Sequence, residues 1–125
     1  MTQIVNGYTI EPGVNLSAAN LSGTILTGAS LTGANLTDAD LSGANLTASN
    51  LTDADLSGAN LTAAVLTDAY FGGAILTRAV LTGASLSGTN FSDAELSGAD
   101  LTDANLLGAI LSGANFSEAI GITDD

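Results

Sequence analysis

The sequence predicts an all-β solenoid, in which short extended segments joined by tight corners wind into a rod. The first observation is a large apolar residue at every fifth position from Leu16 to Phe116, without insertion or deletion. The second is an Ala two positions before most of these residues. Repeats of fixed period dictate architecture, because one unit cannot bury its apolar residues until its neighbours stack on it.

The five-residue period excludes an α-helix and fits an extended chain. Five residues rotate about 140° around a helix, so the large residues would scatter over every face. In an extended segment, residues two apart point the same way. We therefore expect the large residue, called the central residue below, and its Ala to face inward. The Asn or Asp between them should face outward, and Gly or Asp two residues after the central residue suits a corner.

The first residues do not follow the period. Two short β segments, Ile4-Val5 and residues 8–10, flank Asn6-Gly7, a pair that favours a type I′ hairpin turn. We divide the chain into an N-terminal cap (1–13), the repeat array (14–120) and a C-terminal tail (121–125). The cap is expected to cover the first coil, as terminal units of repeat proteins do. A single strand leading into the first coil is the alternative.

Composition limits the partners that the rod can have. Thirteen acidic residues against one base, Arg78, give a net charge of -12. Such a surface repels nucleic acid and anionic membranes, so an electrostatically steered partner is expected to be basic. We predict no nucleic-acid partner and no membrane partner. The N-terminus lacks the pattern of a signal peptide, and no apolar stretch is long enough to cross a membrane, which predicts a cytoplasmic protein.

The repeats resemble those of the pentapeptide-repeat proteins. Residues 34–38 (A-N-L-T-D) and 54–58 (A-D-L-S-G) carry this resemblance, which extends from about Val14 to Ile120. It implies a right-handed quadrilateral β-helix with four repeats, or 20 residues, in each of about five coils. The period alone does not fix this number, since residues 36–48 recur identically at 51–63 and that offset of 15 also fits three sides. The family is especially numerous in cyanobacteria.

The resemblance also suggests functions. Most members have no assigned biochemical role, whereas the quinolone-resistance proteins are dimers whose acidic surface mimics duplex DNA and binds DNA gyrase. This chain shares the acidity but is shorter, and it lacks a projecting loop and an evident C-terminal dimerisation helix. We therefore predict a non-enzymatic structural or protein-binding module that presents a rigid acidic surface. A gyrase-binding DNA mimic is the alternative.

No catalytic or cofactor-binding residue is predicted. The chain has no His, Cys or Lys, which removes the usual nucleophile–base pairs and zinc sites. Carboxylate pairs occur at Asp38/Asp40, Asp53/Asp55 and Asp93/Glu95. A weak Ca²⁺ site is conceivable there, but Ca²⁺ takes about six or more oxygen ligands. We interpret these residues as solvated corner side chains.

An apolar belt is the first candidate contact surface. The position before the central residue is normally polar, but Val65, Tyr70, Ile75 and Val80 occupy it four times in succession. With four repeats per coil these residues form one ring near mid-rod, with Arg78 at a corner. Exposed apolar patches often mark contacts. The alternative is that the position tolerates apolar residues, as the scattered Ile25, Ile110 and Ile120 suggest.

The C-terminal end is the second candidate. A last coil with its core end and strand edges open is prone to pair with another chain. Either the last residues fold over this end, or two chains meet there, and we predict a homodimer through it. The residues concerned are Leu101, Leu106, Leu111, Phe116, Ile120 and Ile122.

Rows of Thr give a third and more remote candidate. A 20-residue coil aligns every twentieth residue, which places two sets of three Thr in straight rows. Such rows resemble the flat Thr ladders of ice-binding solenoids. The residues are Thr27, Thr47 and Thr67 in one row, and Thr62, Thr82 and Thr102 in the other.

Overall fold

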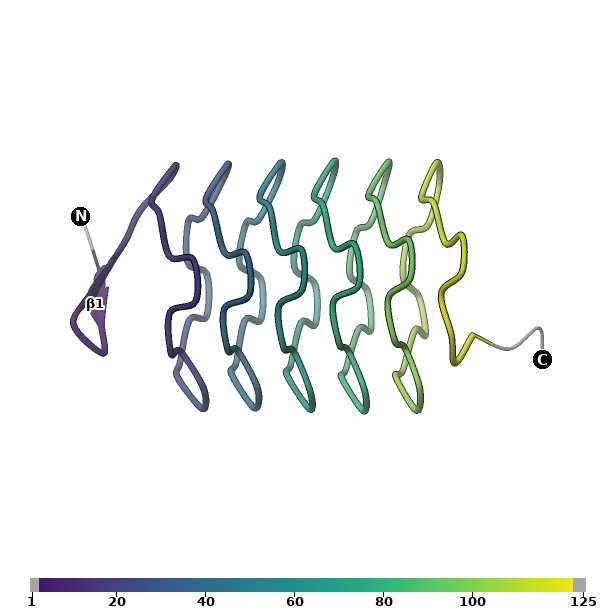
Figure 1. The fold of residues 1–125 in the computed structure, drawn as a ribbon, viewed down its shortest axis with the longest axis horizontal. Coiled ribbons are helices and arrows are strands. Elements are labelled where there is room, and N and C mark those ends of the chain that lie inside the picture. The colour runs from purple at the N-terminus through teal and green to yellow at the C-terminus, as the bar shows by residue number, and fades with distance from the viewer. Residues whose placement is uncertain (1–2, 123–125) are drawn as a thin grey trace.

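The computed structural model describes residues 3–122, which wind into one rod that begins with a hairpin at one end and finishes with the last coil at the other (Figure 1). Parallel bridges between coils join residues 20 positions apart, as in Asn15 with Asn35 and Asn35 with Asp55. One coil therefore takes four pentapeptides, and the offset of 15 between identical segments is not the coil length. The prediction of an all-β, four-sided solenoid is confirmed.

Each corner of the coil is a tight turn that begins at the central residue. In one example the carbonyl oxygen of Leu36 accepts a hydrogen bond of 3.0 Å from the N–H of Ala39. The third residue of this turn, Asp38, has a φ of 60°. A positive φ at the third residue defines a type II turn, which Gly adopts without strain and other residues adopt at some cost. Gly and Asp at this position thus mark the corners, as predicted.

The polar residue before each central residue stabilises the following corner. The Oδ1 atom of Asn35 accepts hydrogen bonds from Thr37, at 3.0 Å from its N–H and at 2.6 Å from its hydroxyl. Asp40 caps Ser42 in the same way. These are Asx turns, in which a short side chain satisfies backbone two residues on. The hydroxyl of Ser42, followed by its N–H, lowers the pKa of the Asp40 carboxyl.

Backbone hydrogen bonds hold one coil to the next. The N–H of Leu36 donates to the carbonyl of Asp55 at 2.7 Å, and the N–H of Asp38 donates to that of Ser57 at 2.9 Å. In the opposite direction, the N–H of Asp55 donates to the carbonyl of Ala34 at 2.9 Å. This pattern recurs along the array, so the coils are held in register like neighbouring strands of a parallel sheet.

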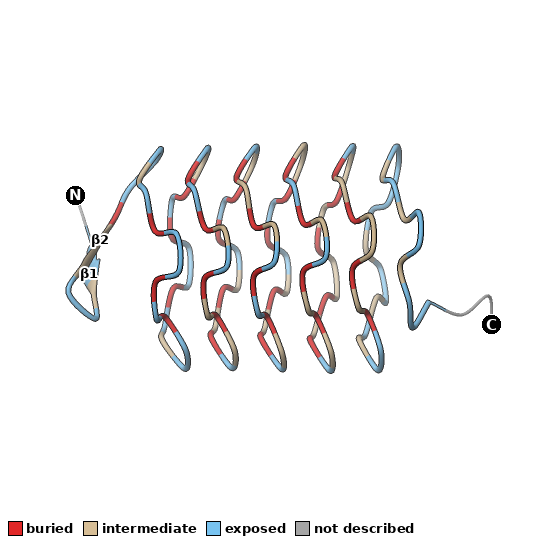
Figure 2. Ribbon diagram, viewed as in Figure 1, coloured by how far each residue is buried: buried red, intermediate tan, exposed pale blue. Residues whose placement is uncertain are grey.

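The core runs along the axis of the rod, where the central residues from Leu16 to Leu101 and the Ala residues two positions before them are buried (Figure 2). Phe71 and Phe91, one coil apart, stack with ring centroids 5.4 Å apart and planes tilted by 39°. Three polar residues replace the inward Ala, and the first of them, Thr24, donates its hydroxyl to the carbonyl of Leu21 at 2.6 Å. Thr89 donates its hydroxyl to the carbonyl of Leu66 at 2.7 Å, whereas the buried Ser49 hydroxyl has no hydrogen-bond partner among the described residues.

A hairpin forms the N-terminal end. Strands β1 (Gln3–Val5) and β2 (Tyr8–Ile10) pair antiparallel. The turn residues Asn6 and Gly7 have φ values of 52° and 81°, as a type I′ turn requires.

The hairpin covers the first coil through both apolar and polar contacts. Ile10 is buried in the core, and Val5 and Tyr8 pack against it. The side-chain amide of Asn6 donates to the carbonyl of Asn20 at 3.2 Å, and the backbone N–H of Asn20 donates to the Tyr8 hydroxyl at 3.4 Å. The cap thus supplies partners for backbone groups that a preceding coil would otherwise satisfy.

Candidate binding surfaces

Four sides run along the rod, and each is identified by the bridged residues that form one row on it. Side 1 carries Asn15, Asn35, Asp55, Ile75, Glu95 and Asn115. Side 2 carries Asn20, Asp40, Asn60, Val80, Asp100 and Ile120. Side 3 carries Ile25, Asn45, Val65, Ser85 and Asn105, and side 4 carries Ser30, Asn50, Tyr70, Asn90 and Ile110.

Negative charge is concentrated on one half of the rod. The bridged rows of sides 3 and 4 contain no charged residue, whereas those of sides 1 and 2 contain four carboxylates. Four more carboxylates lie at the two corners that flank side 1, and only Asp68 and Asp103 in the array lie at the other two corners. We call the first group the acidic half: Asp38, Asp40, Asp53, Asp55, Asp93, Glu95, Asp100 and Glu118.

The apolar belt does not form one continuous surface. Val65, Tyr70, Ile75 and Val80 belong to four different rows, so each lies on a different side of the rod. Tyr70 and Ile75 are 52% and 40% exposed, whereas the two Val residues are half-buried. A flat partner cannot contact all four at once, and only neighbouring members can share a contact.

The coil that carries the apolar belt, residues 65–84, is called the belt coil here. It lacks the Asx caps found in the coil before it. In residues 45–62, an Asn or Asp caps all four corners. In the belt coil the equivalent backbone N–H groups donate to no such side chain, and they have no hydrogen-bond acceptor among residues 3–122. These residues are Thr67, Gly72, Thr77 and Thr82.

Arg78 lies exposed at the corner between sides 1 and 2. It lines a shallow cavity of about 280 Å³ together with Thr77, Ser97, Gly98 and Glu118. Asp38 and Glu118 occupy the same corner two coils before and two coils after it. The single base therefore lies within the acidic half and lowers its charge locally.

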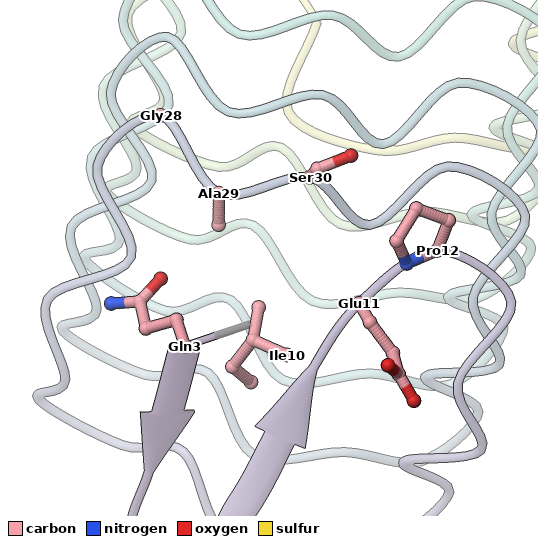
Figure 3. Close-up of a pocket in the computed structure, with 7 residues that line it drawn as sticks. All are labelled: Gln3, Ile10, Glu11, Pro12, Gly28, Ala29 and Ser30. Carbon is pink, nitrogen blue, oxygen red and sulfur yellow. The ribbon is translucent and has the colours of Figure 1, made fainter. Parts of the chain in front are cut away.

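A second cavity, of about 420 Å³, lies between the hairpin and the first coil (Figure 3). Glu11 is its only ionisable lining residue, so it offers no acid–base pair. Gln3, Ile10, Glu11, Pro12, Gly28, Ala29 and Ser30 line it.

Within the described residues, no group of three or more acidic residues is placed to hold a metal ion. The same residues include no helix long and apolar enough to cross a membrane.

The C-terminal end differs in part from the predicted open coil. Leu101 is buried rather than exposed; its N–H donates to the carbonyl of Ile120 at 2.8 Å, and Gly121 lies against the backbone of Leu101 and Thr102. Leu106 and Phe116 are partly buried. The remaining candidates are exposed: Leu111 at 39%, Ile120 at 56% and Ile122 at 41%. Residues 123–125 of the predicted tail lie outside the described part of the chain.

The model of the pentapeptide-repeat family matches residues 15–53, 54–93 and 94–120. The chain belongs to the pentapeptide-repeat family. No curated protein matches it. Among solved structures, it is similar to the pentapeptide-repeat protein Rfr23 of the cyanobacterium Cyanothece 51142, with 30% identity and a TM-score of 0.85 over 88% of this chain and 90% of that one.

Two further solved structures match this chain over most of its length. HetL of the cyanobacterium Nostoc sp. Strain PCC 7120, described as involved in heterocyst differentiation regulation, is 35% identical over 86% of this chain and 68% of its own, with a TM-score of 0.35. QnrB1, a plasmid-mediated fluoroquinolone resistance protein, is 19% identical over 87% of this chain and 70% of its own, with a TM-score of 0.43. The latter likeness concerns the fold alone.

Sequence reasoning found the apolar belt and, with a 20-residue coil, placed the pairs Asp53/Asp55 and Asp93/Glu95 on one edge, but it did not find that charge is concentrated on one half of the rod. The signal was present, because assigning every residue to its position in a 20-residue coil separates the charged rows from the uncharged ones. The total charge alone suggested a uniformly acidic surface.

Proposed function

We propose that this pentapeptide-repeat protein is a non-enzymatic binding module whose acidic half recognises a basic surface of a partner protein. The observation that supports this most directly is the confinement of eight of the array's carboxylates to sides 1 and 2 and the corners flanking side 1. A charge distribution that served only solubility would have no need of two uncharged sides. A cytoplasmic location is part of the proposal.

The rigidity of the rod favours such recognition. Backbone hydrogen bonds fix each coil on the next, so carboxylates in one row recur at multiples of about 4.8 Å. A preorganised surface loses little conformational entropy when it binds. Complementary charge also accelerates association and selects against acidic partners.

A capture experiment with matched variants tests the proposal. The immobilised full chain is expected to retain basic proteins from host lysate and to release them as salt is raised, because salt screens exposed charges. Neutralising side 1 with Asp55→Asn and Glu95→Gln should reduce this capture. The control, Asp68→Asn with Asp103→Asn, removes the same charge outside the acidic half and should leave capture unchanged. Equal losses in both variants would show that only total charge matters.

A DNA mimic that binds DNA gyrase is the second candidate function. It is favoured by the two adjacent acidic sides, which present carboxylates along the axis of a rod much as a duplex presents phosphates. A supercoiling assay with gyrase tests it directly. Inhibition that disappears with the Asp55→Asn/Glu95→Gln variant is expected, and unchanged supercoiling at excess protein would contradict this function.

A homodimer through the C-terminal end remains a further proposal. It is supported by the exposed side chains of Leu111 and Ile120 beside the partly buried Phe116. Sedimentation equilibrium should show a dimer that Leu111→Asn converts to a monomer. A monomer at high concentration would overturn it.

The Thr rows are a remote alternative surface, which a thermal-hysteresis assay tests.

A further inference from the structure

We propose that the corner between Tyr70 and Ile75 is a docking site for an extended basic segment of a partner, in which two cationic side chains lie about 10 Å apart. The proposal rests on the proposed function, because it names the place on the acidic half where a basic partner is held and the chemistry of the segment that is held there.

The corner is flanked by two exposed apolar side chains. Tyr70 on side 4 and Ile75 on side 1 are 52% and 40% exposed, and they flank this corner from its two sides. Gly72 and Gly73 form the corner itself, whereas every other corner of the array has at least one residue with a side chain. Both glycines are half-buried, and the N–H of Gly72 has no acceptor among residues 3–122.

Carboxylates surround this apolar surface. Asp53 and Asp93 occupy the same corner one coil before and one coil after Gly73, and the Asp53 carboxylate lies directly over Gly73. On the adjoining side, Asp55 and Glu95 are the bridge partners of Ile75. Each pair spans two coils, which places its members about 10 Å apart.

The chemistry of this arrangement favours long cationic side chains. Arg and Lys pack their aliphatic stems on apolar surface while their charged ends reach carboxylates, and Arg also stacks on aromatic rings. A purely apolar partner would cover the carboxylates without pairing them, which is costly. A single metal ion cannot bridge carboxylates about 10 Å apart, since its ligands lie within about 2.6 Å of it.

The spacing also selects the conformation of the bound segment. In a polyproline II helix, residues i and i+3 lie on the same side and about 9.3 Å apart. An Arg-x-x-Arg sequence in this conformation matches the two coils between Asp53 and Asp93.

Two labelled peptides of identical composition test the proposal by fluorescence anisotropy with the full chain. One contains Arg-Pro-Leu-Arg and the other contains Leu-Arg-Arg-Pro, in the same Gly-Ser flanks. We expect the first to bind more tightly by about fivefold, and Asp53→Asn with Asp93→Asn to weaken it by about tenfold, since close charge pairs at interfaces contribute strongly. Tyr70→Asn should weaken it several-fold without changing the charge.

The control is Asp68→Asn with Asp103→Asn, which should change the affinity by less than about twofold, as expected for charges remote from a contact. All four Asp residues have φ near 60°, so both variants make the same substitution in the same backbone conformation. Asn tolerates this conformation, and thermal unfolding verifies that both variants fold.

The outcomes separate this site from the broader function. Selective weakening by the first pair of substitutions, together with preference for the first peptide, supports the proposal. Equal weakening by both pairs, or equal affinity for both peptides, overturns the docking site while leaving the acidic half as a diffuse binding surface. If neither peptide binds at low ionic strength, the docking site fails, and the capture experiment with matched variants decides the proposed function separately.

Discussion

Two consecutive coils show what the fold requires and what it leaves free. The capped coil (residues 45–64) has an Asx cap at all four corners, whereas the uncapped coil (65–84) has none among the described residues. Both nevertheless have fully buried central residues and the same backbone ladder. The core and the ladder therefore determine the coil, and the caps only strengthen it. The position before the central residue is thus available for recognition.

The largest expected effect is the loss of stability when a buried central Leu is truncated, and it should be the same in both coils. Leu56 and Leu76 occupy the same row, one in each coil, and both are fully buried. Replacing either with Ala should lower the free energy of unfolding by about 2–5 kcal/mol, because a cavity is left in a packed core. Urea denaturation measures both variants. A much smaller loss at Leu76 would show that the uncapped coil is also loosely packed.

Removing a buried polar group should make the two cores more alike. The Ser49 hydroxyl has no partner among the described residues, and Ala69 occupies the same row one coil later. Ser49→Ala should raise the free energy of unfolding by about 1–3 kcal/mol, the cost of an unsatisfied buried polar group. Thr89→Ala is the contrasting substitution, since it removes a hydroxyl that does donate to Leu66. Equal effects of both would contradict this interpretation.

Introducing Gly at a corner and removing Gly from a corner should change the thermal stability in opposite directions. Arg78 has a φ of 58°, and Gly58 occupies the same corner one coil earlier with a φ of 69°. Arg78→Gly should raise the midpoint of thermal unfolding, because the left-handed conformation costs other residues about 1–2 kcal/mol. Gly58→Ala should lower it, and the Asp38 carboxylate would also have to move. A destabilising Arg78→Gly would indicate a stabilising contact of the Arg side chain.

Adding an Asx cap to one coil and removing an Asx cap from the other tests the comparison of the two coils directly. Val65 and Asn45 are half-buried in the same row, and only Asn45 caps its corner. Val65→Asn should add about 0.5–1.5 kcal/mol of stability and Asn45→Val should remove a similar amount, the net value of a hydrogen bond. Hydrogen exchange at the amide of Thr67 should slow in the first variant. Unchanged exchange would show that the new Asn does not form a cap.

The smallest effect concerns pH. Hydrogen bonds from the hydroxyl and then the N–H of Ser42 lower the pKa of Asp40 below its ordinary value of 3.8, and Thr102 does the same for Asp100. A carboxyl with a lowered pKa contributes stability above its ordinary pKa and loses it as pH falls through the folded value. Thermal unfolding below pH 4 should therefore be less pH-dependent in Asp40→Asn/Asp100→Asn. If the double variant has the same pH dependence of thermal unfolding as the original chain, Asp40 and Asp100 do not cause that dependence.

Much of the rod was predictable because its local contacts join neighbouring residues. The turn from Leu36 to Ala39 contains four residues, and the Asx cap from Asn35 to Thr37 contains three, so a five-residue motif contains both. The surfaces were harder to predict. The belt was recognised as four apolar residues in succession, but only their separate rows show that they face four directions.

The sequence by itself determined the inward residues, the corners and the caps, since each depends on backbone geometry within one repeat. Only the tertiary structure decided that the segments close after four corners, because closure depends on the sum of all the turns. That closure brings residues 20 apart into contact, gathers the carboxylates on one half of the rod, and places Tyr70 and Ile75 on either side of a glycine corner.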